Sequence, residues 1–141
     1  MNTRERLFPR WVLVLPLLFA LGGCGSDTLT GPSAIQDVVW KLATLRRNSA
    51  ATVTIAAPDQ YTAQFLGVTV AVKADCNACS GGYTLNGAAI TIAPMACTRV
   101  ACAAGSYDQD YLAVLQGAQT HGVKDDVLTI SSSAGELTFK H

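Results

Sequence analysis

The sequence predicts an α+β domain that is mainly β, a small curved sheet or barrel of seven to eight short strands with one helix. Short segments in which apolar and polar residues alternate recur along the chain. Turn-forming pairs such as Asn86-Gly87 and Asp125-Asp126 separate several of them. One convincing helix follows, near Ser106. Such a mixture is typical of a β-rich domain closed by a helix.

Residues 1–23 are predicted to be an export signal outside the fold. Three arginines form a basic start, and residues 11–21 follow as an apolar run interrupted only by Pro16. This run is shorter than the ~20 residues that a membrane-spanning helix needs. It ends in Leu21-Gly22-Gly23-Cys24, which resembles a bacterial lipobox, so Cys24 is the expected lipidation site. An ordinary secretory signal and an uncleaved anchor are the alternatives.

Acylation of Cys24 would anchor the protein to a membrane through its N-terminus. Gly25, rather than Asp, follows Cys24. By resemblance to the sorting rules of Gram-negative bacteria, this favours the periplasmic face of the outer membrane. Residues 24–36, which include the turn-forming stretch GSDTLTGPS, are predicted to form the lipidated start and a flexible tether. One domain is expected over residues 37–141.

The charge pattern excludes one class of partner. After residues 1–23 the chain carries seven basic and nine acidic side chains, and Arg46-Arg47 is the only adjacent basic pair. A nucleic-acid partner is therefore unsupported. We expect a monomer without a cofactor.

The first predicted strand covers residues 38–45, where Val38, Trp40 and Leu42 share one face. A turn over 46–51 and a short β-branched strand over 52–55 follow. The next two strands, 61–66 and 68–72, flank Gly67, which indicates a hairpin or a bulge.

A cysteine-rich loop is expected next, up to residue 82. Strands at 83–85 and 89–92 then flank Asn86-Gly87, which indicates a type I′ hairpin turn with positive φ at both residues. Pro94 ends the second of these strands.

The helix is predicted to begin at Ser106, with Gln109 completing a capping box. Asp108 and Asp110 place negative charge in its first turn, where the helix dipole favours it. Gly117 is the expected stop. Its apolar face consists of Tyr111, Val114 and Leu115. Strands at 120–123, 127–130 and 136–140 complete the domain, with turns at 125–126 and 131–135.

Four cysteines in the pattern C-x2-C-x17-C-x4-C lie between residues 76 and 102. An exported protein matures in an oxidising compartment, so two disulfides are the favoured interpretation. Spacing alone leaves three connectivities open. A zinc site is the first alternative, although its second pair would usually have two intervening residues. A redox Cys-x-x-Cys is the second, but Gly81-Gly82 and the surrounding strands do not suit it.

Several motifs resemble the META domain family, the family of the heat-shock lipoprotein HslJ. They are Trp40-x-Leu42, Cys76-Asn77-x-x-Ser80-Gly81-x-Tyr83, Thr98-Arg99-x-x-Cys102, the capped helix, and the strands ending in Leu137-Thr138-Phe139. The resemblance covers about residues 38–140 and implies a compact barrel-like fold. It also implies a Cys76–Cys102 bridge, which leaves Cys79–Cys97 as the second. Asp75 stands where the family commonly has glycine.

The resemblance implies an envelope protein, stress-induced in some members, without established enzymatic activity. Our first hypothesis is therefore a lipid-anchored, disulfide-stabilised module that acts through its surface in envelope maintenance or stress response, with an envelope protein as partner. The alternative is a carrier that binds an apolar ligand inside a small barrel.

No catalytic constellation with supporting spacing is found, so an enzyme is not expected. His121 stands alone, and the paired aspartates are explained by a helix start and a turn. Asn77 and Arg99 are the candidate binding residues. For Asn77 we weigh a ligand mouth against capping of the cysteine segment's backbone. For Arg99 we weigh a partner's carboxylate against a solvated or locally paired side chain.

Overall fold

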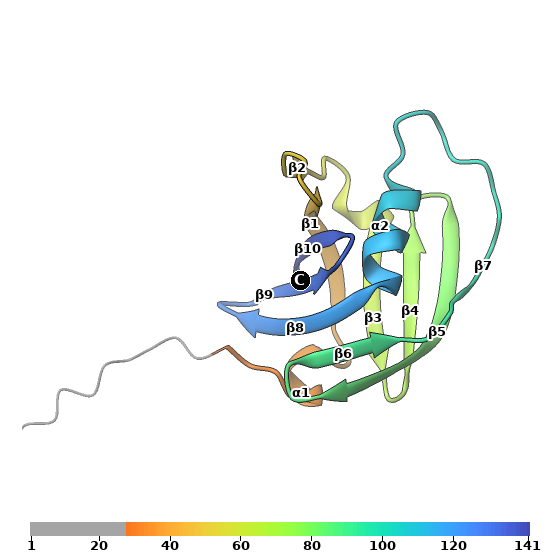
Figure 1. The fold of residues 1–141 in the computed structure, drawn as a ribbon. Coiled ribbons are helices and arrows are strands. Elements are labelled where there is room, and N and C mark those ends of the chain that lie inside the picture. Colours follow the sequence, from red (N-terminus) through yellow and green to blue (C-terminus); the bar gives the residue numbers. More distant parts are fainter. Residues whose placement is uncertain (1–27) are drawn as a thin grey trace, which may run out of the picture.

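The computed structural model describes residues 28–141, which form one barrel with a helix packed against it (Figure 1). The elements in chain order are α1 (Pro32–Ile35), β1 (Val39–Arg47), β2 (Val53–Thr54), a 3-10 turn η1 (Pro58–Gln60), β3 (Tyr61–Leu66), β4 (Thr69–Ala74), β5 (Asn77–Asn86), β6 (Ala89–Ile92), β7 (Ala96–Cys97), α2 (Asp108–Gln116), β8 (Ala118–Lys124), β9 (Val127–Ser132) and β10 (Gly135–Lys140).

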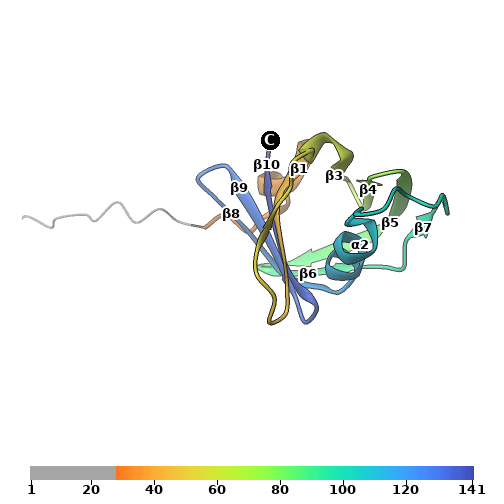
Figure 2. The ribbon, with the colours of Figure 1, turned by 90° about the horizontal axis from the view of Figure 1, so that it is seen from above.

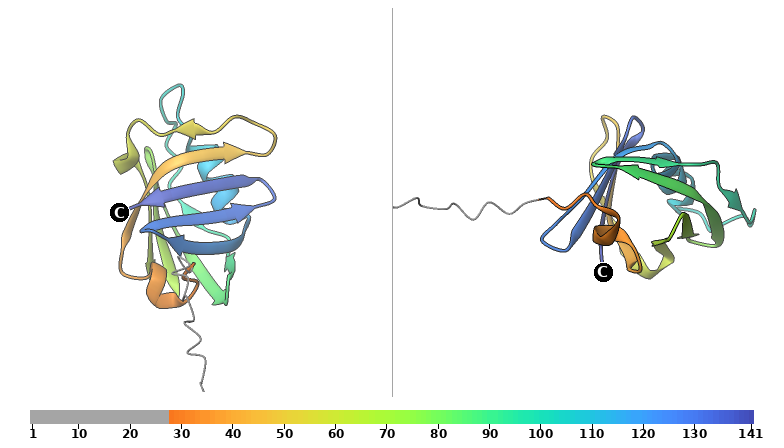
Figure 3. Two further views of the ribbon diagram at one scale, coloured as in Figure 1. Left: turned by 90° about the vertical axis from the view of Figure 1, so that its left-hand side faces the viewer. Right: turned by 90° about the horizontal axis from the view of Figure 1, so that it is seen from below.

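Eight strands close the barrel in the order β1-β3-β4-β5-β6-β8-β9-β10, and β10 pairs back with β1. All the strand pairings are antiparallel. The short β2 and β7 lie outside this circle, on β1 and β5. Figure 3 shows β1, β10, β9 and β8 side by side as one wall. The predicted class, α+β and mainly β, is confirmed, and the eight barrel strands match the seven to eight that were expected. The short strands β2 and β7 and the four-residue helix α1 are additions to the predicted elements.

The helix α2 fills the inner side of the curve that β3 to β6 make (Figure 2). It contacts β1, β4, β6, β9 and β10, which belong to both walls. Tyr111 is fully buried and packs edge-on against Tyr61 and Phe139. Val114 and Leu115 are also buried, as the apolar face of the helix predicts.

The first strand is longer than predicted. β1 continues to Arg47, because Arg46 and Arg47 pair with Glu136 and Gly135 of β10. Its register shifts between Leu42 and Thr44, and this irregularity buries Leu45 on the same side as Trp40 and Leu42. The predicted turn therefore begins two residues too early. Long-range closure of the barrel sets the end of this strand.

The cysteine-rich segment is not the loop that we predicted. β5 begins at Asn77 and continues to Asn86, so Cys79 lies within a strand. A two-residue turn at Asp75-Cys76 joins it to β4, since Ala74 pairs with Asn77. Asp75 has a φ of 56°, a conformation in which aspartate replaces glycine at modest cost. The tight turn is thus kept without glycine.

The hairpin between β5 and β6 forms, but its turn is shifted by one residue. Asn86 pairs with Ala89, so Gly87 and Ala88 are the central residues. Of these two only Gly87 has a positive φ, 57°. This matches a type II′ turn and corrects the type I′ turn expected at Asn86-Gly87. The predicted turn at Asp125-Asp126 does have positive φ at both residues, 51° and 59°.

The N-cap of the helix lies one residue later than the predicted Ser106, and the capping box is absent. Tyr107 is its N-cap residue and makes no side-chain capping bond. The Ser106 hydroxyl instead accepts a hydrogen bond from the Asp108 N–H at 3.2 Å. Gly117 ends the helix as expected, although its φ of −85° is not left-handed. A Cβ there would lie 3.2 Å from the Ala113 carbonyl oxygen.

The part of the expected tether that the structure describes, residues 28–36, packs against the barrel. Leu29 exchanges two backbone hydrogen bonds with Val123 of β8, at 2.7 and 2.8 Å. Ile35 is fully buried, and its carbonyl oxygen accepts from Trp40 Nε1 at 2.9 Å. The ordered domain therefore begins before residue 37. The expected export signal, 1–23, and Cys24 lie outside the described residues. Among the helices of residues 28–141, none has the length and apolarity required to span a bilayer.

His121 of β8 is buried and lies close to the N-terminal segment. Its Nδ1 is 3.2 Å from the Ala88 carbonyl oxygen, and its Nε2 has no hydrogen-bond partner among the described residues. Burial lowers the pKa of His121 below its ordinary value of 6.5. The unfolded chain therefore binds a proton more readily than the folded one.

The domain should accordingly lose stability as pH falls from about 7.5 to 5, since the unfolded His121 is protonated first. If folding lowers the pKa of His121 by one pH unit, the free energy of unfolding is about 1.4 kcal/mol smaller at acid pH than at neutral pH. Urea melts at half-unit pH steps measure this slope. A His121→Phe variant should flatten it above pH 5, where few carboxylates titrate. An equal slope in both proteins would contradict the assignment to His121.

Candidate functional site: a loop held by two disulfides

The strongest candidate site is the segment of residues 98–106, here called the bridged loop, which connects β7 to α2. Figure 1 shows it arching away from the sheet at the upper right. A disulfide between Cys79 of β5 and Cys97 of β7 fixes its start, with Cα atoms 4.0 Å apart. A second disulfide joins Cys102, inside the loop, to Cys76 at 5.4 Å. Both are the pairs that the family resemblance implied.

The disulfides take up all four of these cysteines. No group of three or more histidine, cysteine or acidic side chains suited to a metal occurs within residues 28–141. Cys76 and Cys79, the pair of the redox alternative, are bonded to partners in the bridged loop and in β7 and not to each other. The structure thus contains the structural disulfides and neither the zinc arrangement nor a Cys76–Cys79 redox pair.

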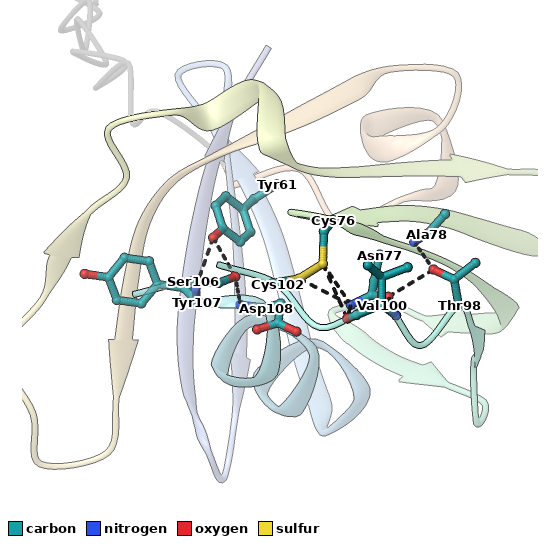
Figure 4. The surroundings of a disulfide bond; sticks show 10 residues. All are labelled: Tyr61, Cys76, Asn77, Ala78, Thr98, Val100, Cys102, Ser106, Tyr107 and Asp108. Atoms are coloured by element: carbon teal, nitrogen blue, oxygen red, sulfur yellow. Dashed lines mark hydrogen bonds between the residues drawn. A yellow bond between two sulfur atoms is a disulfide. The ribbon is translucent and has the colours of Figure 1, made fainter. Parts of the chain in front are cut away.

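Asn77 holds the centre of the bridged loop with its side-chain amide (Figure 4). Its Nδ2 donates to the Val100 carbonyl oxygen at 3.0 Å, and its Oδ1 accepts from the Val100 N–H at 2.8 Å. Oδ1 also accepts from the Thr98 hydroxyl at 3.1 Å. The amide is buried and replaces the neighbouring strand that the loop lacks at this point. Asn77 is therefore a backbone cap, as the second of the two interpretations stated.

Thr98 continues the pairing of β7 with β5 for one more residue. Its backbone N–H donates to the Ala78 carbonyl oxygen at 2.9 Å, and the Ala78 N–H donates to its hydroxyl at 3.0 Å. The Cys79–Cys97 register sets this arrangement. Nothing in the sequence spacing indicated this role for Thr98. The threonine next to Arg99 in the family motif was the only available signal.

Tyr61 of β3 fixes the far end of the loop. Its hydroxyl accepts from the Tyr107 N–H at 3.0 Å and lies 3.3 Å from the Ser106 hydroxyl (Figure 4). These bonds join the loop's end to the barrel wall just before α2 begins. Tyr61 was predicted only as a strand residue, because its partner is 46 residues away in the chain.

The first part of the bridged loop faces solvent. All four residues from Thr98 to Ala101 are exposed, and Val100 retains 57% of its accessible surface. Arg99 forms no ion pair or side-chain hydrogen bond within residues 28–141. A depression of about 410 Å3 lies between the bridged loop and the first turn of α2, lined by residues 100–103, 105–106 and 108–110. Of the two candidate binding residues, Arg99 is thus presented outward and Asn77 lies beneath it.

The remaining polar candidates are not brought together. Asp110 is paired with Arg47 at 2.8 Å, Asp125-Asp126 form the β8–β9 turn, and His121 lies on β8. The barrel interior is occupied by packed side chains. The largest fully buried ones are Trp40, Tyr111, Phe65, Phe139, Ile35, Leu42, Leu45, Ile90, Leu115, Leu128, Ile130 and Leu137. They fill the space in which a carrier would hold its ligand.

Fold and site together define a class, a small closed β-barrel with one helix and a disulfide-held surface loop. A family model described as the META domain matches residues 33–141. The chain therefore belongs to the META domain family, as the motifs around Asn77 and Arg99 indicated.

Solved structures agree with this fold. The NMR structure of a protein from Burkholderia xenovorans is similar to this chain with a TM-score of 0.65 and 20% identity, over 89% of this chain and 97% of that one. A second NMR structure gives a TM-score of 0.60 and 21% identity, over 79% and 95%. At these identities the likeness concerns the fold alone. A search of curated proteins gives no significant match.

Proposed function

We propose that this protein is a lipid-anchored envelope lipoprotein that presents the bridged loop to other envelope molecules. It acts without catalysis, in envelope maintenance or in the response to stress. The anchor is Cys24, and the expected location is the periplasmic face of the outer membrane.

The observation that carries this proposal is the fixation of an exposed loop at four places. Two disulfides, the Asn77 amide and the Tyr61 hydroxyl hold its backbone, while Arg99 and Val100 are exposed to solvent. Disulfides persist in oxidising compartments, which supports export. Order in an exposed loop reduces the entropy that a partner must overcome on binding. Binding at the surface explains this arrangement better than stabilisation of the hydrophobic core does, because the exposed Val100 and Arg99 contribute little to that core.

The position of the loop suits an anchored protein. The first described segment, residues 28–31, which is orange in Figure 1, and the bridged loop lie on opposite sides of the barrel (Figures 1 and 2). A lipid on Cys24 would therefore leave the loop directed away from the membrane. The carrier alternative gains no comparable support, because aromatic and aliphatic side chains occupy the interior.

Lipidation is tested by metabolic labelling. Radiolabelled palmitate should be incorporated into the wild-type protein and be absent from Cys24→Ala, because only Cys24 follows the lipobox-like residues. Membrane fractionation should show the label in the outer membrane. The matched control is Cys76→Ala. It also removes one cysteine but leaves Cys24 in place, so it should still incorporate the label. Label retained in Cys24→Ala would contradict the anchor.

The surface role is tested by crosslinking in intact cells. A photoreactive amino acid in place of Ala101, an exposed residue of the bridged loop, should give a defined adduct that the same substitution at Lys124, an exposed residue of β8, does not give. Adducts in equal yield from both positions, or none from position 101, would contradict a partner at the bridged loop.

A further inference from the structure

We propose that the bridged loop is a substrate-like inhibitor of trypsin-like serine proteases. In this proposal Arg99 enters the protease's specificity pocket, and Asn77 is a positioning residue that keeps the loop intact. The inference deepens the proposed function by naming the class of partner. It rests on that proposal only for the surface role of the loop.

A trypsin-like protease selects a basic side chain through an aspartate at the bottom of its pocket. The described basic residues are Lys41, Arg46, Arg47, Lys73, Arg99, Lys124 and Lys140, and all except Arg99 lie in strands. A strand within a barrel cannot enter a protease cleft, because both of its edges are held by neighbours. Arg99 lies instead on an exposed, protruding segment without helix or strand. The structure thus offers one peptide bond to such an enzyme, Arg99–Val100.

The residues around this bond are constrained as an inhibitor requires. Cys97 is bridged two positions before Arg99, and Cys102 is bridged three positions after it. Thr98 is hydrogen-bonded to Ala78 through both its N–H and its hydroxyl. A loop that is already ordered loses little entropy on docking, so it binds more tightly than a flexible peptide of the same sequence.

The bonds from Asn77 act on the leaving side of the reaction. The protease serine would attack the Arg99 carbonyl carbon, forming an ester and breaking the bond to the Val100 nitrogen. The serine proton passes through the protease histidine to that nitrogen, which becomes an amine. Asn77 holds Val100 at both its N–H and its carbonyl group, and Cys102 is tethered to Cys76.

The amine therefore stays beside the ester instead of diffusing away. Its return attack re-forms the peptide bond and frees the serine, with no net consumption of water. Hydrolysis, which needs water in place of the amine, is slowed. A tightly bound and slowly cut loop is the consequence.

The test uses the full processed protein, purified with its disulfides intact, and bovine trypsin with a fluorogenic arginine substrate. Inhibition should be competitive with a Kd in the micromolar range or below. Arg99→Ala should weaken it by about 100-fold or more, since a side chain that fills a specificity pocket dominates binding. Lys124→Ala, an exposed cation on β8, should leave it unchanged. Chymotrypsin, whose pocket is apolar, should not be inhibited.

Asn77 is tested by the ratio of inhibition to cleavage. Asn77→Asp keeps an acceptor for the Val100 N–H but loses the donor to its carbonyl oxygen, and Asn77→Ala loses both. The rate of cutting at Arg99–Val100, measured by mass spectrometry, should rise from wild type to Asn77→Asp to Asn77→Ala. Thr98→Val provides a second loop variant if Asn77→Ala fails to form its disulfides, and it too should be cut faster.

Three results would overturn the proposal: no inhibition by the wild type at 100-fold excess, equal inhibition by Arg99→Ala, or wild-type cutting as fast as that of the Asn77 variants. These assays are independent of lipidation and of cellular partners. Failure here with a persistent crosslink at position 101 would leave the surface role standing with a different partner. Inhibition without any crosslink would instead count against the cellular role alone.

Discussion

Replacement of all four bridged cysteines by alanine should lower the free energy of unfolding by about 6 kcal/mol. The Cys76–Cys102 bridge spans a sequence separation of 26 and the Cys79–Cys97 bridge one of 18, nested inside the first. Chain-entropy arithmetic assigns roughly 3 kcal/mol to a single bridge of this size. The expected loss is comparable to the whole stability of a typical small domain, about 5–15 kcal/mol. The four-fold variant should therefore be largely unfolded at 37 °C.

Nesting makes the two bridges interdependent. While one bridge remains, the unfolded chain is already shortened, so removal of the other should cost only about 2.5 kcal/mol. Urea melts measure this difference. The proteins compared are the four-fold variant and the two double variants, Cys76→Ala/Cys102→Ala and Cys79→Ala/Cys97→Ala. The losses from the two double variants should sum to less than the loss from the four-fold variant. A four-fold variant as stable as the wild type would show that the bridges do not stabilise the fold.

Substitution of Gly135 by alanine should be among the most damaging single changes outside the cysteines, at about 3 kcal/mol or more. Gly135 has a φ of 153°, a backbone angle that residues other than glycine rarely adopt. A Cβ there would overlap the Arg46 carbonyl oxygen and lie 2.9 Å from the Arg47 Cα. Both contacts are with β1 backbone, which can move only if the β1–β10 closure opens.

Gly67→Ala is the matched control for this prediction. Gly67 also has a positive φ, 56°, but a Cβ there has nothing within 4 Å. It should cost only the conformational term, about 1–2 kcal/mol. Thermal melts of both variants separate the two terms. Equal losses would mean that the close approach of β10 to β1 contributes nothing.

The alternating segments and turn residues were sufficient to predict the fold class and most of the strands. Trp40, Leu42 and Tyr111 were correctly assigned to the core, because apolar residues at strand or helix spacing share one face of their element, and that face packs against the core. The errors lie where distant residues decide. The extension of β1 to Arg47 depends on β10, whose pairing residue Gly135 lies far along the chain. The start of β5 at Asn77 depends on a turn that aspartate can make.

The candidate site was predictable in its parts but not in its geometry. Family motifs indicated Asn77 and Arg99, and the resemblance implied the cysteine pairing. No pattern in the sequence shows that one amide bonds both backbone groups of Val100, or that Tyr61 fixes the loop's far end. Such side-chain to backbone bonds join residues 23 and 46 positions apart, and sequence periodicity carries no information about them.

Mass spectrometry of the processed protein, taken from the envelope fraction and digested without reduction, tests the central claim most directly. Peptides joined through Cys76–Cys102 and through Cys79–Cys97 should be recovered, together with an N-terminal peptide that carries acyl chains on Cys24. Free thiols at these four positions, or an unmodified Cys24 preceded by residues 1–23, would contradict an exported loop held in place by disulfides.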